Sequence, residues 1–306
     1  MGLNKKVLQE IQSRIESDFS CIISSVQYVK TGGFKHVYKA EVNGKIEALK
    51  IFEIPDLSQH PDSEEVRKEI VGRALREINI LNDCSSPEIV KLGSITTTDY
   101  EIGANRYIVY SEEFLEGKDL DNIIKEENIT PGEDELKILF LSLVKAIQEI
   151  WNLKQWVHRD IKPANVMKTK DTKRPFVLLD LGIAYSARGT RLTFNPLNRM
   201  PIGTHRYMAP ERLIPSQMHN IDYRSDFYSA AVSVFMYASG KHPLRIGIKE
   251  QYEHTFYKTL NELPTPLKDL RTDLSDDFCE LVDNMMNKRP ALRLSNFSLI
   301  INRLEL

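Results

Sequence analysis

The hydrophobic pattern of this chain changes its period along the sequence. Near its start, apolar residues alternate with polar ones in three runs, Val26–Val29, Val37–Val42 and Ile46–Ile51. Such alternation predicts β-strands. Asn43 and Gly44 separate the last two runs, and both residue types tolerate positive φ, so this pair predicts a two-residue hairpin turn.

Further along the chain the period lengthens to about 3.6 residues, which is typical of helices. We predict helices over about 63–82, for the strongly apolar stretch 136–151, and at several places in 210–306. Two more strands are expected near 89–96 and 106–111. Strands first and helices later indicate an α+β protein with a bilobal fold: a small, mainly β lobe with one key helix, and a larger, mainly α lobe.

These patterns set the expected domain boundaries. A helical extension over 1–19 precedes one domain over 20–306, whose N-lobe covers 20–115 and whose C-lobe covers 116–306. Apolar residues of the extension fall on one helical stripe, which favours packing on the first lobe. A helix that binds a partner protein is the alternative.

Composition argues against several function classes. The net charge of −2 gives no global basicity for nucleic-acid binding. Cys21, Cys84 and Cys279 are too few and too scattered for a disulfide framework or a zinc site, and we interpret them as thiols in a reducing compartment. No apolar run approaches the ~18 residues of a membrane span. We expect a soluble, cytoplasmic protein without nucleic-acid or membrane partners, and leave its oligomeric state open.

One polar loop carries the chemistry: residues 158–165 read HRDIKPAN. Phosphoryl transfer needs metal ions, positive charge near the γ-phosphate and an acceptor for the substrate's hydroxyl proton. Asp160 can accept that proton, Lys162 can contact the γ-phosphate, and Asn165 can offer a carbonyl oxygen to Mg²⁺. The alternative is a polar turn in which these side chains make only local hydrogen bonds.

This stretch resembles the catalytic loop of the eukaryotic-type protein kinase superfamily, H-R-D-x-K-P-x-N. Further motifs follow in the family's order over residues ~26–294. Asp180-Leu181-Gly182, after an apolar run, resembles the D-F-G motif with Leu in place of Phe. The resemblance implies that Asp180, with Asn165, binds the Mg²⁺ that bridges the ATP phosphates.

Ala48-Leu49-Lys50 resembles the A-x-K motif of the family's third strand. In an alternating strand Ala48 and Lys50 share a face, so Ala48 would cover the adenine while Lys50 reaches the α- and β-phosphates. Glu77 falls on or beside the apolar face of the helix predicted over 63–82, where a carboxylate is costly unless paired. We expect the family's strand-to-helix salt bridge between Lys50 and Glu77, with an enlarged loop around residues 55–63.

The glycine-rich loop departs from the family's pattern, G-x-G-x-x-G-x-V. Gly32 and Val37 keep their places, whereas Lys30 and Lys35 stand where the outer glycines are expected. Lost glycines restrict how closely the backbone can approach phosphates. Lys35 could supply a positive charge near them instead.

Residues 109–119 resemble the hinge between kinase lobes. Glu113 and Leu115 would then offer backbone groups to the adenine edge. Glu112 would guard the back pocket, where a carboxylate is unusual.

The segment 203–211 resembles the family's G-T-x-x-Y-M-A-P-E substrate-docking segment. The resemblance implies that Glu211 pairs with Arg293 and that Asp226 braces the backbone of the catalytic loop. Lys162 together with Thr204 is the pattern of Ser/Thr kinases.

These motifs imply a serine/threonine protein kinase that uses ATP and Mg²⁺, acts on a protein substrate and autophosphorylates. Phosphorylation of Thr190 or Thr193 would create a partner for Arg159 and order the activation loop; a constitutively ordered loop is the alternative. The altered glycine loop favours a rival interpretation, a nucleotide-binding pseudokinase that acts as a scaffold or switch. A small-molecule acceptor is disfavoured by the docking segment.

Overall fold

The computed structural model describes residues 2–32, 35–54, 63–126, 129–181, 185–186 and 204–305. The chain forms two compact units. The N-terminal unit comprises Met1–Asp83 and Val90–Leu115, and the C-terminal unit comprises Cys84–Ile89 and Glu116–Leu306.

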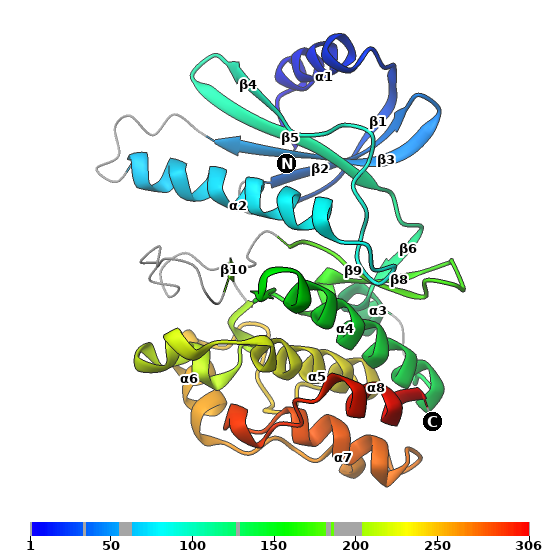
Figure 1. Ribbon diagram of the computed structural model, residues 1–306, viewed down its shortest axis with the longest axis vertical. Coiled ribbons are helices and arrows are strands. Elements are labelled where there is room, and N and C mark those ends of the chain that lie inside the picture. Colours follow the sequence, from blue (N-terminus) through cyan, green and yellow to red (C-terminus); the bar gives the residue numbers. More distant parts are fainter. Residues whose placement is uncertain are drawn as a thin grey trace. The chain divides into compact units, whose positions relative to one another are not determined.

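The N-terminal unit is a five-stranded antiparallel sheet with two helices (Figure 1). Its elements are α1 (Lys5–Phe19), β1 (Ile23–Gly32), β2 (Lys35–Val42), β3 (Lys45–Ile54), α2 (Ser63–Asp83), β4 (Thr98–Ile102) and β5 (Asn105–Glu113). The strand order is β1-β2-β3-β5-β4. The predicted hairpin turn is confirmed, because Asn43 and Gly44 have φ of 48° and 80° between β2 and β3.

Helices α1 and α2 cover opposite faces of this sheet (Figure 1). Ile11 and Ile15 of α1 are fully buried in a core cluster that includes Leu49 and Ile51 of β3. The intervening Lys50 points to the other face, toward α2. The apolar stripe of α1 is therefore occupied by the sheet, which is the packing expected for this helix.

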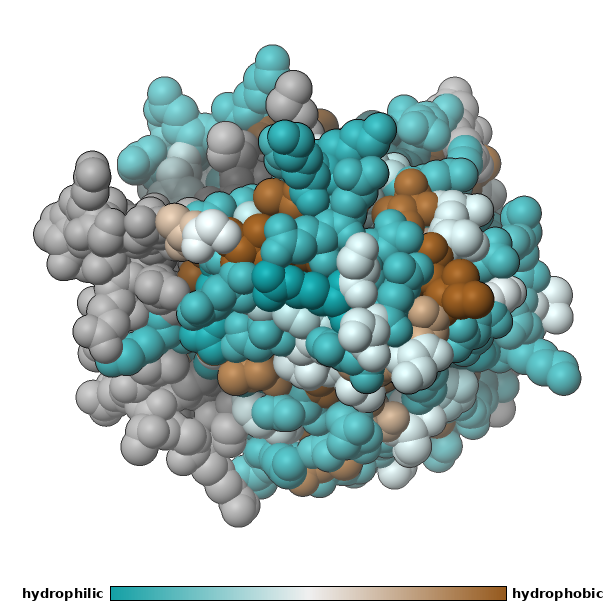
Figure 2. All heavy atoms as spheres, turned by 90° about the horizontal axis from the view of Figure 1, so that it is seen from above, coloured by the Kyte–Doolittle hydropathy of each residue, from teal (hydrophilic) through white to brown (hydrophobic). Residues whose placement is uncertain are grey.

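The outer side of α1 is polar. Its exposed residues are Lys5, Lys6, Gln9, Glu10, Ser13, Ser17 and Asp18. Figure 2 shows that hydrophilic side chains cover most of the described surface on the upper face of the molecule, with only small separate hydrophobic patches. The alternative of α1 as a partner-binding helix gains no support from its outer face.

The prediction of a strand near 89–96 is wrong. Only isolated bridges occur there, and the fourth strand lies at Thr98–Ile102. The segment keeps some backbone hydrogen bonds to β5, such as that from Gly93 N–H to the carbonyl oxygen of Ser111 at 2.8 Å. Side chains take over other donors: the backbone N–H of Ser94 donates to the Glu47 carboxylate at 3.0 Å, and that of Ile95 to Ser111 Oγ at 2.9 Å. Apolar residues alone could not reveal that these donors are satisfied by side chains.

The C-terminal unit is mainly helical (Figure 1). Its strands are β6 (Gly117–Asp119), β7 (Trp156–Val157), β8 (Val166–Thr169), β9 (Phe176–Leu178) and β10 (Tyr185–Ser186). Its α-helices are α3 (Leu120–Glu126), α4 (Glu133–Lys154), α5 (Tyr223–Ser239), α6 (Tyr252–Asn261), α7 (Asp276–Met285) and α8 (Phe297–Glu305). Short 3₁₀ helices are η1 (Pro163–Asn165), η2 (Thr204–Tyr207), η3 (Pro210–Leu213), η4 (Pro215–Asn220), η5 (Leu267–Asp269) and η6 (Pro290–Leu292).

Helix α5 is the centre of this unit, since its residues from Ser225 to Ala238 are all buried. A mainly β unit with one key helix and a larger, mainly α unit confirm the predicted fold class. In the described part of the chain, no helix combines the length and apolarity required to traverse a bilayer.

Candidate active site

In the N-terminal unit, the expected ion pair between strand and helix is present. Lys50 Nζ lies 2.9 Å from Glu77 Oε1. Both side chains are buried, at 6% and 0% exposure. The strand β3 places Lys50 beside α2 because alternate residues of a strand point to one face.

Lys50 has a second carboxylate partner, which the sequence did not predict. Glu112 of β5, at 2% exposure, forms an ion pair with Lys50 through Oε1. Burial raises the pKa of the Glu112 carboxyl, and the adjacent Lys50 ammonium opposes that rise. The signal in the sequence was a carboxylate at an apolar position, which needs a buried cation.

Lys35, in the place of a family glycine, lies against the same helix. Its Nζ is 3.2 and 3.3 Å from the two carboxylate oxygens of Glu77. Val37 is buried and pairs in register with Lys50. Gly32 has open space where a Cβ would lie, and the neighbouring Gly33 and Phe34 lie outside the described residues.

At the end of β5, the backbone of Glu113 is partly occupied. Its N–H donates to the carbonyl oxygen of Lys91 at 2.9 Å, so this N–H is already paired within the unit. Leu115 is half-buried at the end of this unit. Ala48 pairs in register with Glu112 and shares a face with Lys50.

In the C-terminal unit, the three candidate residues of the catalytic loop are in contact. Asp160 Oδ2 accepts hydrogen bonds from Lys162 Nζ at 2.8 Å and from Asn165 Nδ2 at 3.0 Å. Asn165 Nδ2 also donates to the Asp160 carbonyl oxygen at 2.9 Å. Asp160 Oδ1 is buried and has no hydrogen-bond partner among the described residues. The loop therefore fixes one carboxylate oxygen and leaves the other able to accept a proton.

Asp226 of α5 braces this loop as expected. Its carboxylate accepts the backbone N–H groups of His158 at 2.7 Å and of Arg159 at 2.9 Å. Arg212, which the sequence did not single out, donates to the carbonyl oxygen of Arg159 at 2.6 Å. Arg159 has φ of 65°, so these contacts hold a strained backbone next to Asp160.

Asp180 lies two residues after the end of β9 and also has φ of 65°. The backbone N–H of Leu179 donates to the carbonyl oxygen of Asn165 at 2.8 Å, which brings the segments of Asp180 and Asn165 together. Leu181 is fully buried and supplies the apolar anchor expected in place of Phe. Gly182 lies outside the described residues.

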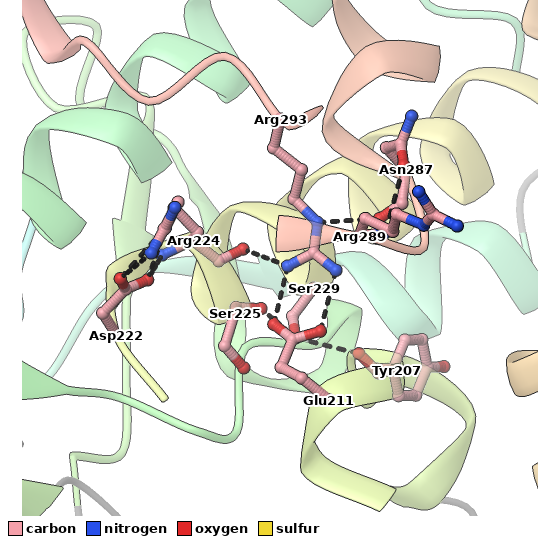
Figure 3. Close-up of polar contacts among 9 residues, drawn as sticks. All are labelled: Tyr207, Glu211, Asp222, Arg224, Ser225, Ser229, Asn287, Arg289 and Arg293. Carbon is pink, nitrogen blue, oxygen red and sulfur yellow. Dashed lines mark hydrogen bonds and ion pairs between the residues drawn. The ribbon is translucent and has the colours of Figure 1, made fainter. Parts of the chain in front are cut away.

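The docking segment is anchored by a bidentate ion pair (Figure 3). Arg293 donates through two nitrogens to the Glu211 carboxylate, at 2.7 and 2.8 Å, and both residues are buried. Arg293 also donates to the carbonyl oxygens of Arg224 and Asn287, each at 2.8 Å. Ser229 Oγ of α5 donates to the carbonyl oxygen of Tyr207 at 2.8 Å. The expected Glu211–Arg293 pair is present.

Several expected residues cannot be placed. Gly203 and the candidate phosphorylation sites Thr190 and Thr193 lie outside the described residues. The loop expected around 55–63 is also outside them, except for Ser63, where α2 begins.

Comparison with known proteins identifies the family. A family model described as protein kinase domain matches residues 23–303. A probable serine/threonine-protein kinase of Clostridium perfringens is 28% identical over 282 residues, which cover 92% of this chain and 37% of that relative. A dual specificity mitogen-activated protein kinase kinase of Caenorhabditis elegans is 31% identical over 167 residues, 53% of this chain and 43% of that protein.

A dual specificity mitogen-activated protein kinase kinase of Drosophila melanogaster is 27% identical over 226 residues, 74% of this chain and 52% of the relative. The chain thus spans about half or less of the length of each of these relatives. The family match extends over nearly all of the described residues and includes the candidate side chains of both units. This chain belongs to the protein kinase family.

Proposed function

We propose that this chain transfers the γ-phosphoryl group of ATP to a Ser or Thr hydroxyl of a protein substrate, and also to itself. The observation that carries the proposal is the state of Asp160, whose buried Oδ1 has no donor among the described residues. Its Oδ2 is held by Lys162 and Asn165. A fixed carboxylate with one available oxygen suits acceptance of the proton of an attacking hydroxyl.

The other assigned groups act on the nucleotide. Lys50 binds the α- and β-phosphates, and Glu77 orients it. Lys162 contacts the γ-phosphoryl group as it moves to the acceptor. Gly32 and Val37 cover the phosphates and the ring.

The adenine is assigned to three residues of the N-terminal unit. Ala48 covers the ring, since a small side chain leaves room for it. The carbonyl oxygen of Glu113 and the backbone N–H of Leu115 bind its edge.

The residues present fit a magnesium ion. Asn165 and Asp180 supply an amide and a carboxylate oxygen from adjacent segments, and Mg²⁺ prefers oxygen ligands. We propose that phosphate and water oxygens complete the coordination, as is usual for Mg²⁺. When bound, Mg²⁺ neutralises charge on the phosphates.

The choice of a protein hydroxyl, and of Ser or Thr, rests on two features. The anchored docking segment supports a peptide substrate. Lys162 with Thr204 supports Ser and Thr, as does the name of the bacterial relative, whereas two animal relatives are named dual specificity kinases. We also propose a cytoplasmic location, which the three buried cysteine thiols support.

The test is transfer of label from γ-labelled ATP with Mg²⁺ to the chain itself and to a generic protein substrate. Asp160→Asn should lower transfer by about 10³-fold or more while nucleotide still binds. Asp134→Asn, an exposed change on α4, is the matched control and should leave transfer unchanged. Hydrolysis of the product should release phosphoserine and phosphothreonine. Equal transfer by Asp160→Asn would refute the assignment.

A second candidate function is a nucleotide-binding switch without transfer. Lys30 and Lys35 in place of two loop glycines favour it. Nucleotide binding with no transfer, in Mg²⁺ or Mn²⁺, would support that candidate over the kinase activity.

A further inference from the structure

Four charged side chains form a continuous buried chain of ion pairs in the N-terminal unit. In order they are Lys35, Glu77, Lys50 and Glu112. Glu77 accepts from both lysines, at 3.2 Å from Lys35 and 2.9 Å from Lys50, and Lys50 also contacts Glu112. The side chains are between 0% and 12% exposed. The two positive and two negative formal charges cancel.

The strand register brings the four residues together. Lys35 of β2 pairs with Phe52 of β3, two residues from Lys50 and on the same face. Lys50 in turn pairs with Tyr110 of β5, two residues from Glu112 on that face. The ammonium of Lys35 also lies 5.5 Å from the centre of the Phe52 ring. The register of the sheet thus places Lys35 on the face that packs against α2.

Each end of this chain of charges depends on the other. Burial and the neighbouring Glu77 charge both raise the pKa of the Glu112 carboxyl, while Lys50 and Lys35 lower it. Without Lys35, one ammonium would face two buried carboxylates. Without Glu112, two ammonium groups would share one carboxylate. Either change breaks a pair within this buried chain of ion pairs, and removal of one partner of a buried pair is strongly destabilising.

We propose that Lys35 and Glu112 are a coupled pair of positioning residues that hold the Lys50 ammonium for the nucleotide phosphates. Glu112 binds Lys50 in addition to Glu77, and Lys35 supplies the cation that balances the extra carboxylate. The two departures from the family's pattern, a lysine for a glycine and a carboxylate at the back-pocket position, are therefore one arrangement. The contact of Lys50 with phosphate rests on the proposed function, whereas the coupling between Lys35 and Glu112 does not.

A double-mutant cycle on the full chain tests the coupling without any assay of phosphate transfer. Lys35→Met and Glu112→Met should each lower the thermal midpoint by roughly 5–10 °C. The double variant keeps the neutral Lys50–Glu77 pair and should recover most of that loss. Lys6→Met, at an exposed lysine of α1, is the control. When it is combined with Glu112→Met, the two changes in thermal midpoint should be additive.

The stability outcomes separate cleanly. A loss of thermal midpoint in the double variant that is smaller than the sum of the two single losses supports the coupling. A double variant that folds when the single variants do not supports it as well. Additive losses, or a double variant that alone fails to fold, would overturn it. If the two single variants and the double variant are all insoluble, the more conservative changes Lys35→Gln and Glu112→Gln give the same cycle with less repacking.

Binding distinguishes a positioning role from a general loss of structure. Each single variant should weaken ADP binding by about tenfold but leave adenosine binding within about twofold, because Lys50 acts on the phosphates. The double variant should bind ADP nearly as wild type does. Equal losses for ADP and adenosine, or a double variant weaker for ADP than either single one, would refute the proposal. Coupling measured in a chain that transfers no phosphate would leave the inference standing and sink the proposed kinase activity alone.

Discussion

Removal of Arg293 tests whether the buried ion pair to Glu211 holds the docking segment. Arg293→Met deletes two hydrogen bonds to the Glu211 carboxylate and two to backbone carbonyl oxygens. Glu211 is 4% exposed, so its carboxylate would stay buried without a cation. Breaking one partner of a buried pair costs about 3–5 kcal/mol. At roughly 2–4 °C per kcal/mol for a unit of this size, the thermal midpoint should fall by about 10 °C.

A matched arginine on the surface provides the control. Arg303 of α8 pairs with Asp277, but the two side chains are 33% and 64% exposed. An exposed pair contributes at most about 1 kcal/mol, so Arg303→Met should shift the midpoint by less than about 4 °C. Thermal unfolding followed by circular dichroism measures both variants under one set of conditions.

The double variant Arg293→Met, Glu211→Met tests whether the unpaired Glu211 carboxylate causes the loss of stability. Replacing both partners by apolar side chains removes the buried unpaired charge, so the double variant should be more stable than Arg293→Met alone. Phosphorylation of a protein substrate should fall further than nucleotide affinity, because the docking segment is what the pair anchors. Equal shifts for Arg293→Met and Arg303→Met would refute the reasoning, as would a double variant less stable than the single one.

Three further outcomes are expected. Asp226→Asn, which replaces an acceptor of two loop N–H groups, should lower kcat by about 10²-fold with little change in KM for ATP in steady-state kinetics. Burial lowers the pKa of His242 to about 3, so below pH 6.5 the folded state binds fewer protons than the unfolded state. The free energy of unfolding should therefore fall as the pH drops from 6.5 toward 3. In denaturant titrations, His242→Asn should abolish that part of the pH dependence. Mass spectrometry after incubation with ATP should find phosphate on Thr190 or Thr193, and fully active protein unmodified at both would contradict a role for phosphorylation in activation.

Local signals account for the parts of the fold that were predicted. The strands β2 and β3 follow from alternation, and Asn43-Gly44 fixes their register, which places Lys50 on one face. Helix α2 follows from its period, and an acidic residue beside its apolar face pointed to a buried cation. The Glu211–Arg293 pair has no such signal: 82 residues separate its members, and only the resemblance to a family implied it.

Contacts that depend on the register of distant strands could not be predicted. The pairing of β3 with β5 sets Ala48 opposite Glu112, and no turn links these strands in sequence. The same limit explains the wrong strand near 89–96. The backbone donors of Ser94 and Ile95 in this segment are satisfied by side chains from other parts of the sheet, those of Glu47 and Ser111.

This limit changes how the two unusual residues bear on activity. Taken singly, Lys35 is a lost glycine, which favours a pseudokinase, and Glu112 is an unusual carboxylate in an apolar position. In the folded unit they are connected by ion pairs through Glu77 and Lys50. Under the proposed coupling, loss of one partner leaves the other destabilising, so the two departures are weighed together. Under that proposal, Lys30 is the outer glycine position that remains a separate reason to favour a nucleotide-binding switch.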